Sequence, residues 1–171
     1  MTRAEFGTTE AAEARFRGGV RELLFPRSAA IVGASDRRAE SIRNALRGAI
    51  PVWGVNPNRT EVLGIPCHPS VFELPETPEL AVLLVGHGRV EQAFEEAAAA
   101  GVHAFVLPGL GNEAGKEGKP IAERIAARAA AVGCSIVGPN CMGVAVPGGF
   151  SSWIGTLAET VVPGHVAALV Q

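Results

Sequence analysis

The chain has 171 residues, of which 47% are hydrophobic and 19% charged, and this balance excludes an intrinsically disordered protein. Fifteen basic and 17 acidic residues leave a formal net charge of −2, which gives no electrostatic case for binding nucleic acid or an anionic membrane. Aromatic residues make up 5% and tyrosine is absent, so a stacking surface for single-stranded nucleic acid is not expected.

The first 20 residues are charged and contain no apolar run of the kind found in signal peptides. We interpret residues 1–20 as a solvated helical arm and residues 21–171 as one domain that is long enough to bury a substantial core. No apolar run approaches the roughly 20 residues that a membrane-spanning helix needs.

Short apolar runs recur along the rest of the chain, and most are followed by a turn that contains glycine or proline. The runs are continuously apolar rather than alternating, which is typical of strands covered on both faces of a parallel sheet. The predicted strands are residues 29–32, 52–55, 80–85, 103–107, 135–137 and 165–170.

Helical patterns separate several of these strands. We predict helices over residues 41–46, 90–100 and 120–132, the last with Pro120 in its first turn and Gly133 at its end. Residues 56–77 contain four prolines and are expected to wrap a sheet edge without a full helix. The alternation predicts an α/β fold, a Rossmann-like, doubly wound and mainly parallel sheet in three α/β/α layers.

Ligands of such sheets bind beyond the carboxyl ends of the strands, so the residues after each strand are the candidate site. Gly33, Ala34 and Ser35 follow the first strand, where small residues let a phosphate approach the backbone N–H groups of the next helix. The segment is not a G-x-G-x-x-G fingerprint, and a strand–helix turn without a ligand is the alternative interpretation.

Asn58 and Arg59 follow the second strand. An NAD-binding fold would have a carboxylate about 20 residues after the first glycine, but the nearest acid here is Glu61. The Arg59 guanidinium instead suits a ribose phosphate, as in coenzyme A (CoA) or NADP, unless it is a solvated loop charge.

The later turns also offer candidates. Gly86 and His87 follow the third strand, and Pro108 and Gly109 follow the fourth, where glycine permits close approach of a thin chain such as pantetheine. Ordinary turns explain these residues equally well.

Asn140 and Cys141 follow the fifth strand. A nucleophilic Cys141 is one hypothesis, but the sequence places no histidine or acid beside it, and a free cysteine is commonly a small buried residue. The other cysteines are Cys67 and Cys134, an odd total without metal-ligand spacing, so we expect no metal site and a reduced, cytoplasmic protein.

Three segments resemble a known family: VGAS at 32–35, VNPNRTEVLGIPCHPS at 55–70 and GPNCMGV at 138–144. They are similar to the CoA-binding domain of the NDP-forming acyl-CoA synthetases, relatives of the succinyl-CoA synthetase alpha subunit. The resemblance covers residues 23–171, and GPNCMGV is its most specific motif. PGHVAALVQ at 163–171 resembles the entry into that family's second domain, so we expect a fragment of a longer protein.

The resemblance implies that the domain holds CoA or acyl-CoA while a histidine of another domain carries phosphate from an acyl phosphate to the nucleotide. None of His68, His87, His103 and His165 has a similar context, so the chain is expected to bind without turnover and to have no catalytic residue. The partners implied are further domains or a nucleotide-binding beta subunit of the same enzyme.

Site residues follow from the same resemblance. Gly33, Ala34 and Ser35 would contact the phosphates, Asn58 and Arg59 the adenosine end, Gly86 and His87 the path between, Pro108 and Gly109 pantetheine, and Asn140 and Cys141 the thiol. Ser41 would cap its helix and add a phosphate contact. The chain departs from the family at Arg38 and Ala39, where Pro-Gly is usual, and at His87, where Pro-Ala or similar is common.

Two other functions stay open from the residues. A stand-alone regulatory CoA-binding protein is one alternative. The NADP-binding Rossmann domain of an oxidoreductase is the other, although the first turn lacks the second glycine of its fingerprint.

Overall fold

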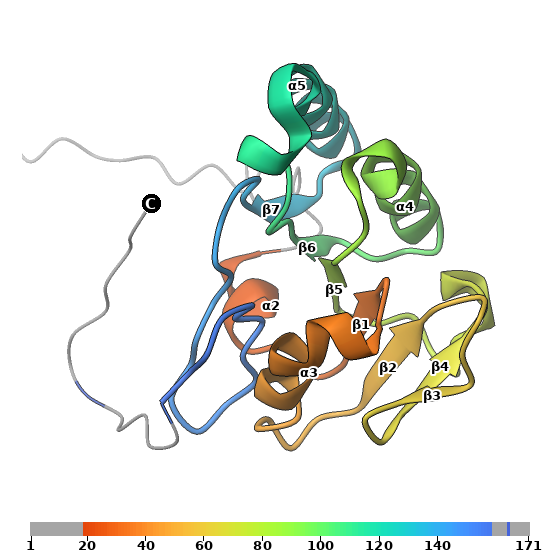
Figure 1. The fold of residues 1–171 in the computed structure, drawn as a ribbon, viewed down its shortest axis with the longest axis vertical. Helices are drawn as coiled ribbons and strands as arrows, with labels where there is room; N and C mark the ends of the chain where they lie inside the picture. Colours follow the sequence, from red (N-terminus) through yellow and green to blue (C-terminus); the bar gives the residue numbers. More distant parts are fainter. Residues whose placement is uncertain (1–18, 159–163, 165–171) are drawn as a thin grey trace, which may run out of the picture.

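A computed structural model of the protein describes residues 19–158 and Gly164. Its centre is a seven-stranded sheet of order β3-β4-β2-β1-β5-β6-β7 (Figure 1), in which every neighbouring pair is parallel except β3 with β4. The predicted α/β fold with a mainly parallel, doubly wound sheet is therefore confirmed. The strands are β1 (Ala29–Val32), β2 (Val52–Val55), β3 (Glu61–Val62), β4 (Ile65–His68), β5 (Leu80–Leu83), β6 (Ala104–Val106) and β7 (Ser135–Val137).

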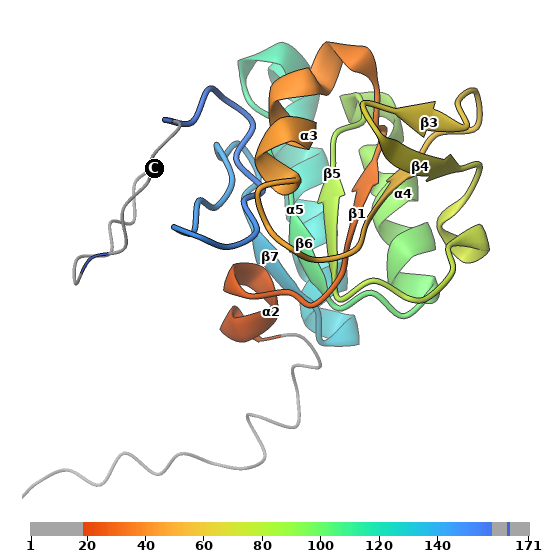
Figure 2. The same cartoon turned by 90° about the horizontal axis from the view of Figure 1, so that it is seen from below.

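Helices cover both faces of the sheet, as Figures 1 and 2 show. Helices α4 and α5 pack on one face, and α2, α3 and the segment 142–155 lie over the other. Alternate residues of β1 supply the two cores: Ala30 and Val32 join the α4 and α5 side, and Ala29 and Ile31 the α3 side. The helices are α2 (Val20–Leu24), α3 (Ala39–Ala45), α4 (His87–Ala99) and α5 (Gly115–Val132), with short 3₁₀ turns η1 (Asp36–Arg38), η2 (Val71–Glu73) and η3 (Asn112–Ala114).

Residues 56–77 wrap the sheet edge without a full helix, as predicted, but they also form the strands β3 and β4, which the sequence analysis missed. The four prolines of this segment were the basis for expecting no full helix, and no strand was predicted there. In β4 the Pro66 side chain is exposed, while Ile65 and Cys67 on either side of it are buried.

Three predicted helix starts are wrong. Helix α4 begins at His87 rather than at residue 90, and α5 begins at Gly115, so Pro120 lies inside the helix instead of in its first turn. Helix α3 begins at Ala39, which makes Ser41 its third residue; Ser41 is buried and does not cap the helix.

Some predictions fall outside the described residues. These are the strand at 165–170 and residues 1–18 of the arm, so the division into 1–20 and 21–171 stays a prediction. Within the described part of the chain, no helix is long and apolar enough to cross a membrane.

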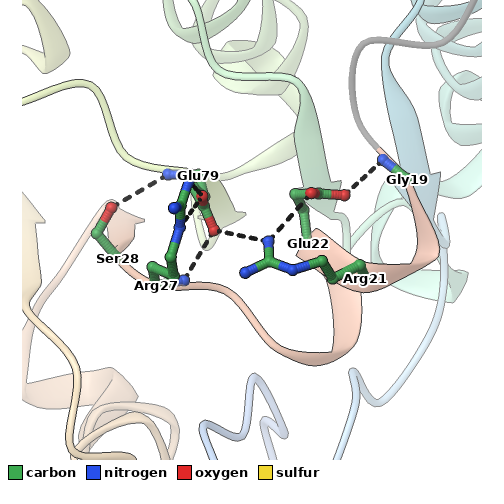
Figure 3. Close-up of polar contacts among 6 residues, drawn as sticks. All are labelled: Gly19, Arg21, Glu22, Arg27, Ser28 and Glu79. Carbon is green, nitrogen blue, oxygen red and sulfur yellow. Dashed lines mark hydrogen bonds and ion pairs between the residues drawn. The ribbon is translucent and has the colours of Figure 1, made fainter.

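Glu79 ties the start of β1 to the start of β5, at the sheet end opposite to the candidate site (Figure 3). Its carboxylate accepts hydrogen bonds from the backbone N–H and the guanidinium of Arg27 and from the guanidinium of Arg21. Burial alone would raise the pKa of Glu79, but these hydrogen bonds outweigh it and hold that pKa below its ordinary value.

Replacing Glu79 with glutamine is expected to lower the free energy of unfolding by about 1–2 kcal/mol at pH 7. The pKa of Glu79 is lower in the folded than in the unfolded protein. The stabilisation by its carboxylate is therefore fully present above the unfolded pKa of about 4.3, and it is lost as the pH falls through the folded pKa. Urea denaturation of the wild type and Glu79→Gln at pH 7 and pH 3 measures this. The exposed Glu73, changed to glutamine, is the control; an equal loss in both variants would refute the prediction.

Candidate functional site

The turn after β1 lies at the switch point of the sheet. From β1 the chain continues to β2 on one side, and the later strands β5, β6 and β7 lie on the other, so a crevice forms between the ends of β1 and β5. Gly33 has φ +87°, and a Cβ there would be 2.8 Å from the carbonyl oxygen of Leu84. Only glycine suits this backbone and this close contact.

The turns after β1 and β2 are bound to each other. Gly33 N–H donates to the Val55 carbonyl (2.9 Å), and the Asn56 side-chain amide donates to the Ala34 carbonyl (2.7 Å). The Arg59 guanidinium lies 3.4 Å from the Asp36 carboxylate, with both side chains more than half exposed. Asn58 N–H closes a local turn on the Asn56 side chain. The structure thus brings the predicted phosphate and adenosine residues together.

A cavity of about 530 Å³ opens beside this turn, between the chain segments that follow β5, β6 and β7. Half of the predicted site residues line it, and all of them come from the later turns: Gly86, His87, Pro108, Gly109, Asn140 and Cys141.

The other predicted residues, which are Gly33, Ala34, Ser35, Ser41, Asn58 and Arg59, do not line the cavity. Gly33 nevertheless contacts Leu84 and Val85, which do, so the turns after β1 and β2 adjoin the cavity at the switch point. Ser41 is buried inside α3, and the structure does not bring it to the cavity.

Sequence reasoning missed several lining residues, among them Arg38, Glu113, Met142 and Ile154. Met142 directly follows Cys141, and Glu113 lies four residues after Gly109, so the rule about strand ends could have included both. Ile154 had no such signal because it reaches the cavity on a segment that returns across α3.

The turns after β6 and β7 are held together by backbone contacts. Asn140 N–H donates to the Gly109 carbonyl (2.8 Å), and Asn140 adopts φ +58°, which asparagine tolerates better than most residues. Gly111 leaves room for the Asn140 side chain, since a Cβ on Gly111 would overlap its oxygen. Leu110, also in the cavity wall, has φ +71°, an unfavourable conformation for its side chain.

Cys141 is a half-buried thiol without an acid–base partner in the described part of the chain. Its Sγ donates to the carbonyl oxygens of Leu107 and Val137, each at 3.6 Å. Burial raises the pKa of the Cys141 thiol, and backbone hydrogen bonds counter that only in part. The thiol is therefore protonated at neutral pH, which argues against the nucleophile hypothesis.

Glu113 and His87 are polar residues of the cavity wall. Glu113 accepts a hydrogen bond from Gly111 N–H (3.0 Å), and backbone N–H groups, its own first among them, hold the pKa of Glu113 below its ordinary value. His87 Nε2 lies 3.9 Å from a carboxylate oxygen of Glu117. No cluster of three or more possible metal ligands occurs among the described residues.

The segment 142–155 closes the wall near Cys141 and is anchored to α3. The Asn44 amide, almost fully buried, donates to the carbonyls of Trp153 (2.9 Å) and Gly155 (2.8 Å). Gly48 lets the segment pack closely, because a Cβ there would lie 2.7 Å from the Phe150 Cα atom. Asn44 therefore anchors the chain around Ile154, whose N–H in turn donates to the Met142 carbonyl (2.9 Å).

Comparison with known proteins places this geometry in context. The sequence profile of a family described as "CoA binding domain" matches residues 27–147. The chain is similar to the ADP-forming acetate–CoA ligase I of Archaeoglobus fulgidus, at 35% identity over 127 residues that cover 71% of this chain and 18% of that protein. It is also similar to the alpha subunit of the ADP-forming acetate–CoA ligase I of Pyrococcus furiosus, at 29% identity over 88% of this chain and 35% of that subunit.

A solved structure has the same fold. The apo form of the dinucleotide-forming acetyl-coenzyme A synthetase 1 of Ca. Korarchaeum cryptofilum superposes with a TM-score of 0.72 and 28% identity, over 81% of this chain and 31% of that one. The chain thus spans between about a fifth and a third of the length of these relatives.

Proposed function

Because the chain belongs to the family of CoA-binding domains found in ADP-forming acyl-CoA synthetases, we propose that it binds CoA or acyl-CoA in the crevice at the carboxyl ends of β1 and β5. The coenzyme's phosphates lie on the turn Gly33–Ser35, and its pantetheine enters the cavity that ends at Asn140 and Cys141.

One observation carries this proposal: the small-residue turn after β1 directly adjoins the cavity. Gly33 contacts Leu84 and Val85, and these residues form part of the cavity wall that leads to Cys141. A volume of about 530 Å³ is within the usual range for small-molecule sites. The nucleotide end then rests outside, over Asn58 and Arg59.

We propose further that the whole protein is an acid–thiol ligase of the NDP-forming kind. The relatives named above are ligases or a ligase subunit, and this chain covers only a minor part of each. The phosphate-carrying histidine then lies outside this chain, in another domain or a beta subunit, and the chain's own role is to hold the coenzyme. A cytoplasmic location remains a prediction of the cysteine content.

Isothermal titration of the chain with CoA, dephospho-CoA and NADP tests the proposal. We expect saturable CoA binding, and a gain in stability of about 2.7 kcal/mol at a CoA concentration 100 times Kd. No heat with CoA from a well-folded sample would overturn the proposal. Tighter binding of NADP than of CoA would favour the oxidoreductase alternative.

The 3′-phosphate contact is tested by replacing Arg59 with alanine. Loss of this charge-assisted contact should weaken CoA by about 1–3 kcal/mol and leave dephospho-CoA, which lacks the 3′-phosphate, nearly unchanged. Lys119→Ala removes one positive charge from the exposed surface of α5 and is the control for general electrostatics. Equal losses for both ligands would disprove the role of Arg59.

A further inference from the structure

Arg38 is the one lysine or arginine, among the described residues, that lines the cavity. It ends the 3₁₀ turn η1, which follows the turn after β1, so its backbone stands next to the proposed phosphate site. Arg38 lines the cavity together with His87, Glu113 and Cys141. Arg38 therefore connects the two parts of the site.

The surrounding charges leave Arg38 available to a ligand. Nearby, Arg59 pairs with Asp36 and Arg43 with Glu40. Arg38 forms no ion pair with any residue that the structure describes, and its backbone N–H is bonded to the Ser35 carbonyl.

The cavity also needs a cation if it is to admit an anion. Glu113 lines it as a carboxylate, because backbone N–H groups hold its pKa low. A diphosphate entering beside this carboxylate is repelled unless a positive group intervenes. The backbone N–H groups after β1 supply only partial charges, whereas a guanidinium offers a full charge and a planar pair of donors suited to phosphate oxygens.

We infer that Arg38 binds the diphosphate of the coenzyme. The cavity therefore selects a pantetheine chain that is attached to a nucleotide. This inference rests on the proposed function and adds a binding residue to it. Arg38 and Arg59 then bind different phosphates. Arg38 binds the diphosphate, which CoA and dephospho-CoA share. Arg59 binds the 3′-phosphate, which CoA has and dephospho-CoA lacks.

The test is titration of wild type, Arg38→Ala and Arg38→Lys with CoA and with dephospho-CoA, at 50 and 200 mM salt. Arg38→Ala should weaken both ligands equally, by about 5- to 30-fold, and reduce the salt dependence of binding. Arg38→Lys should recover much of the affinity because it keeps the charge. The control is Arg37→Ala, an exposed neighbour outside the cavity wall, with a change of less than about twofold expected.

Each outcome distinguishes the inference from the proposed function. If wild type does not bind CoA, the proposed function fails. If wild type binds and Arg38→Ala binds both ligands as tightly, or loses affinity only for CoA, the inference alone fails. Melting temperatures of the unliganded variants should match the wild type; a lowered melting temperature with affinity not restored in Arg38→Lys would indicate a structural role and overturn the inference.

Discussion

Replacing Gly33 with alanine should lower the free energy of unfolding by about 2–5 kcal/mol and weaken CoA binding by roughly tenfold or more. Two costs add in this variant. An L side chain at φ +87° is strained, and the new Cβ would lie 2.8 Å from the Leu84 carbonyl oxygen and from a Val85 methyl group. The turn must shift away from β5, which moves the N–H groups proposed to bind phosphate.

Gly64 is the matched control for this prediction. It has φ +83°, nearly the same as Gly33, but a Cβ there would meet nothing within 4 Å. Gly64→Ala should therefore cost only about 1–2 kcal/mol and leave the affinity for CoA unchanged. Denaturant unfolding and titration of both variants separate backbone strain from the close contact with β5. Equal effects in the two variants would show that the contact with Leu84 has no importance.

Replacing Asn44 with leucine should cost about 2–4 kcal/mol of stability. The change removes both hydrogen bonds that anchor the segment 142–155 and leaves the carbonyls of Trp153 and Gly155 without these donors. Since Met142 and Ile154 line the cavity, CoA should also bind more weakly, by about threefold to tenfold if the wall loosens.

Arg47 provides the comparison for Asn44. Its guanidinium donates to the carbonyls of Leu157 (3.0 Å) and Ala158 (2.6 Å), which lie just beyond the segment 142–155, but it is exposed to solvent. Arg47→Ala should cost less than about 1 kcal/mol, because water replaces an exposed donor at little expense. If both variants lose the same stability, burial of the Asn44 amide is not what makes it the stronger anchor.

The central strands were predictable because burial on both faces makes them continuously apolar. The strands predicted at 29–32, 52–55 and 135–137 have the bounds that the structure gives, and only the ends of β5 and β6 were extended too far. Strand β3 was missed because it has only two residues, and β4 because it contains Pro66. The pairing of β4 with β2 brings together residues that no local pattern connects.

Helix starts were less predictable for a physical reason. Residues 115–119 of α5 contain two glycines, which disfavour a helix. In the structure Gly118 packs closely on Ala114 and on the Leu110 carbonyl, and this packing stabilises the helical conformation. The same limit applies to Ser41, whose type suited a cap although its place in α3 is buried.

The candidate site was predictable where it follows the strand ends. Pro108, Gly109, Asn140 and Cys141 line the cavity because parallel strands end at one edge, a rule that needs no coordinates. Arg38 and Ile154 depend on how η1 and the segment 142–155 fold back, which no local pattern encodes.

A crystal structure of the chain grown with CoA tests the central claim most directly. We predict density for the diphosphate between the turn that begins at Gly33 and the Arg38 guanidinium, and density for the thiol arm inside the cavity as far as Cys141. A coenzyme bound elsewhere on the chain, with that cavity empty, would contradict the account.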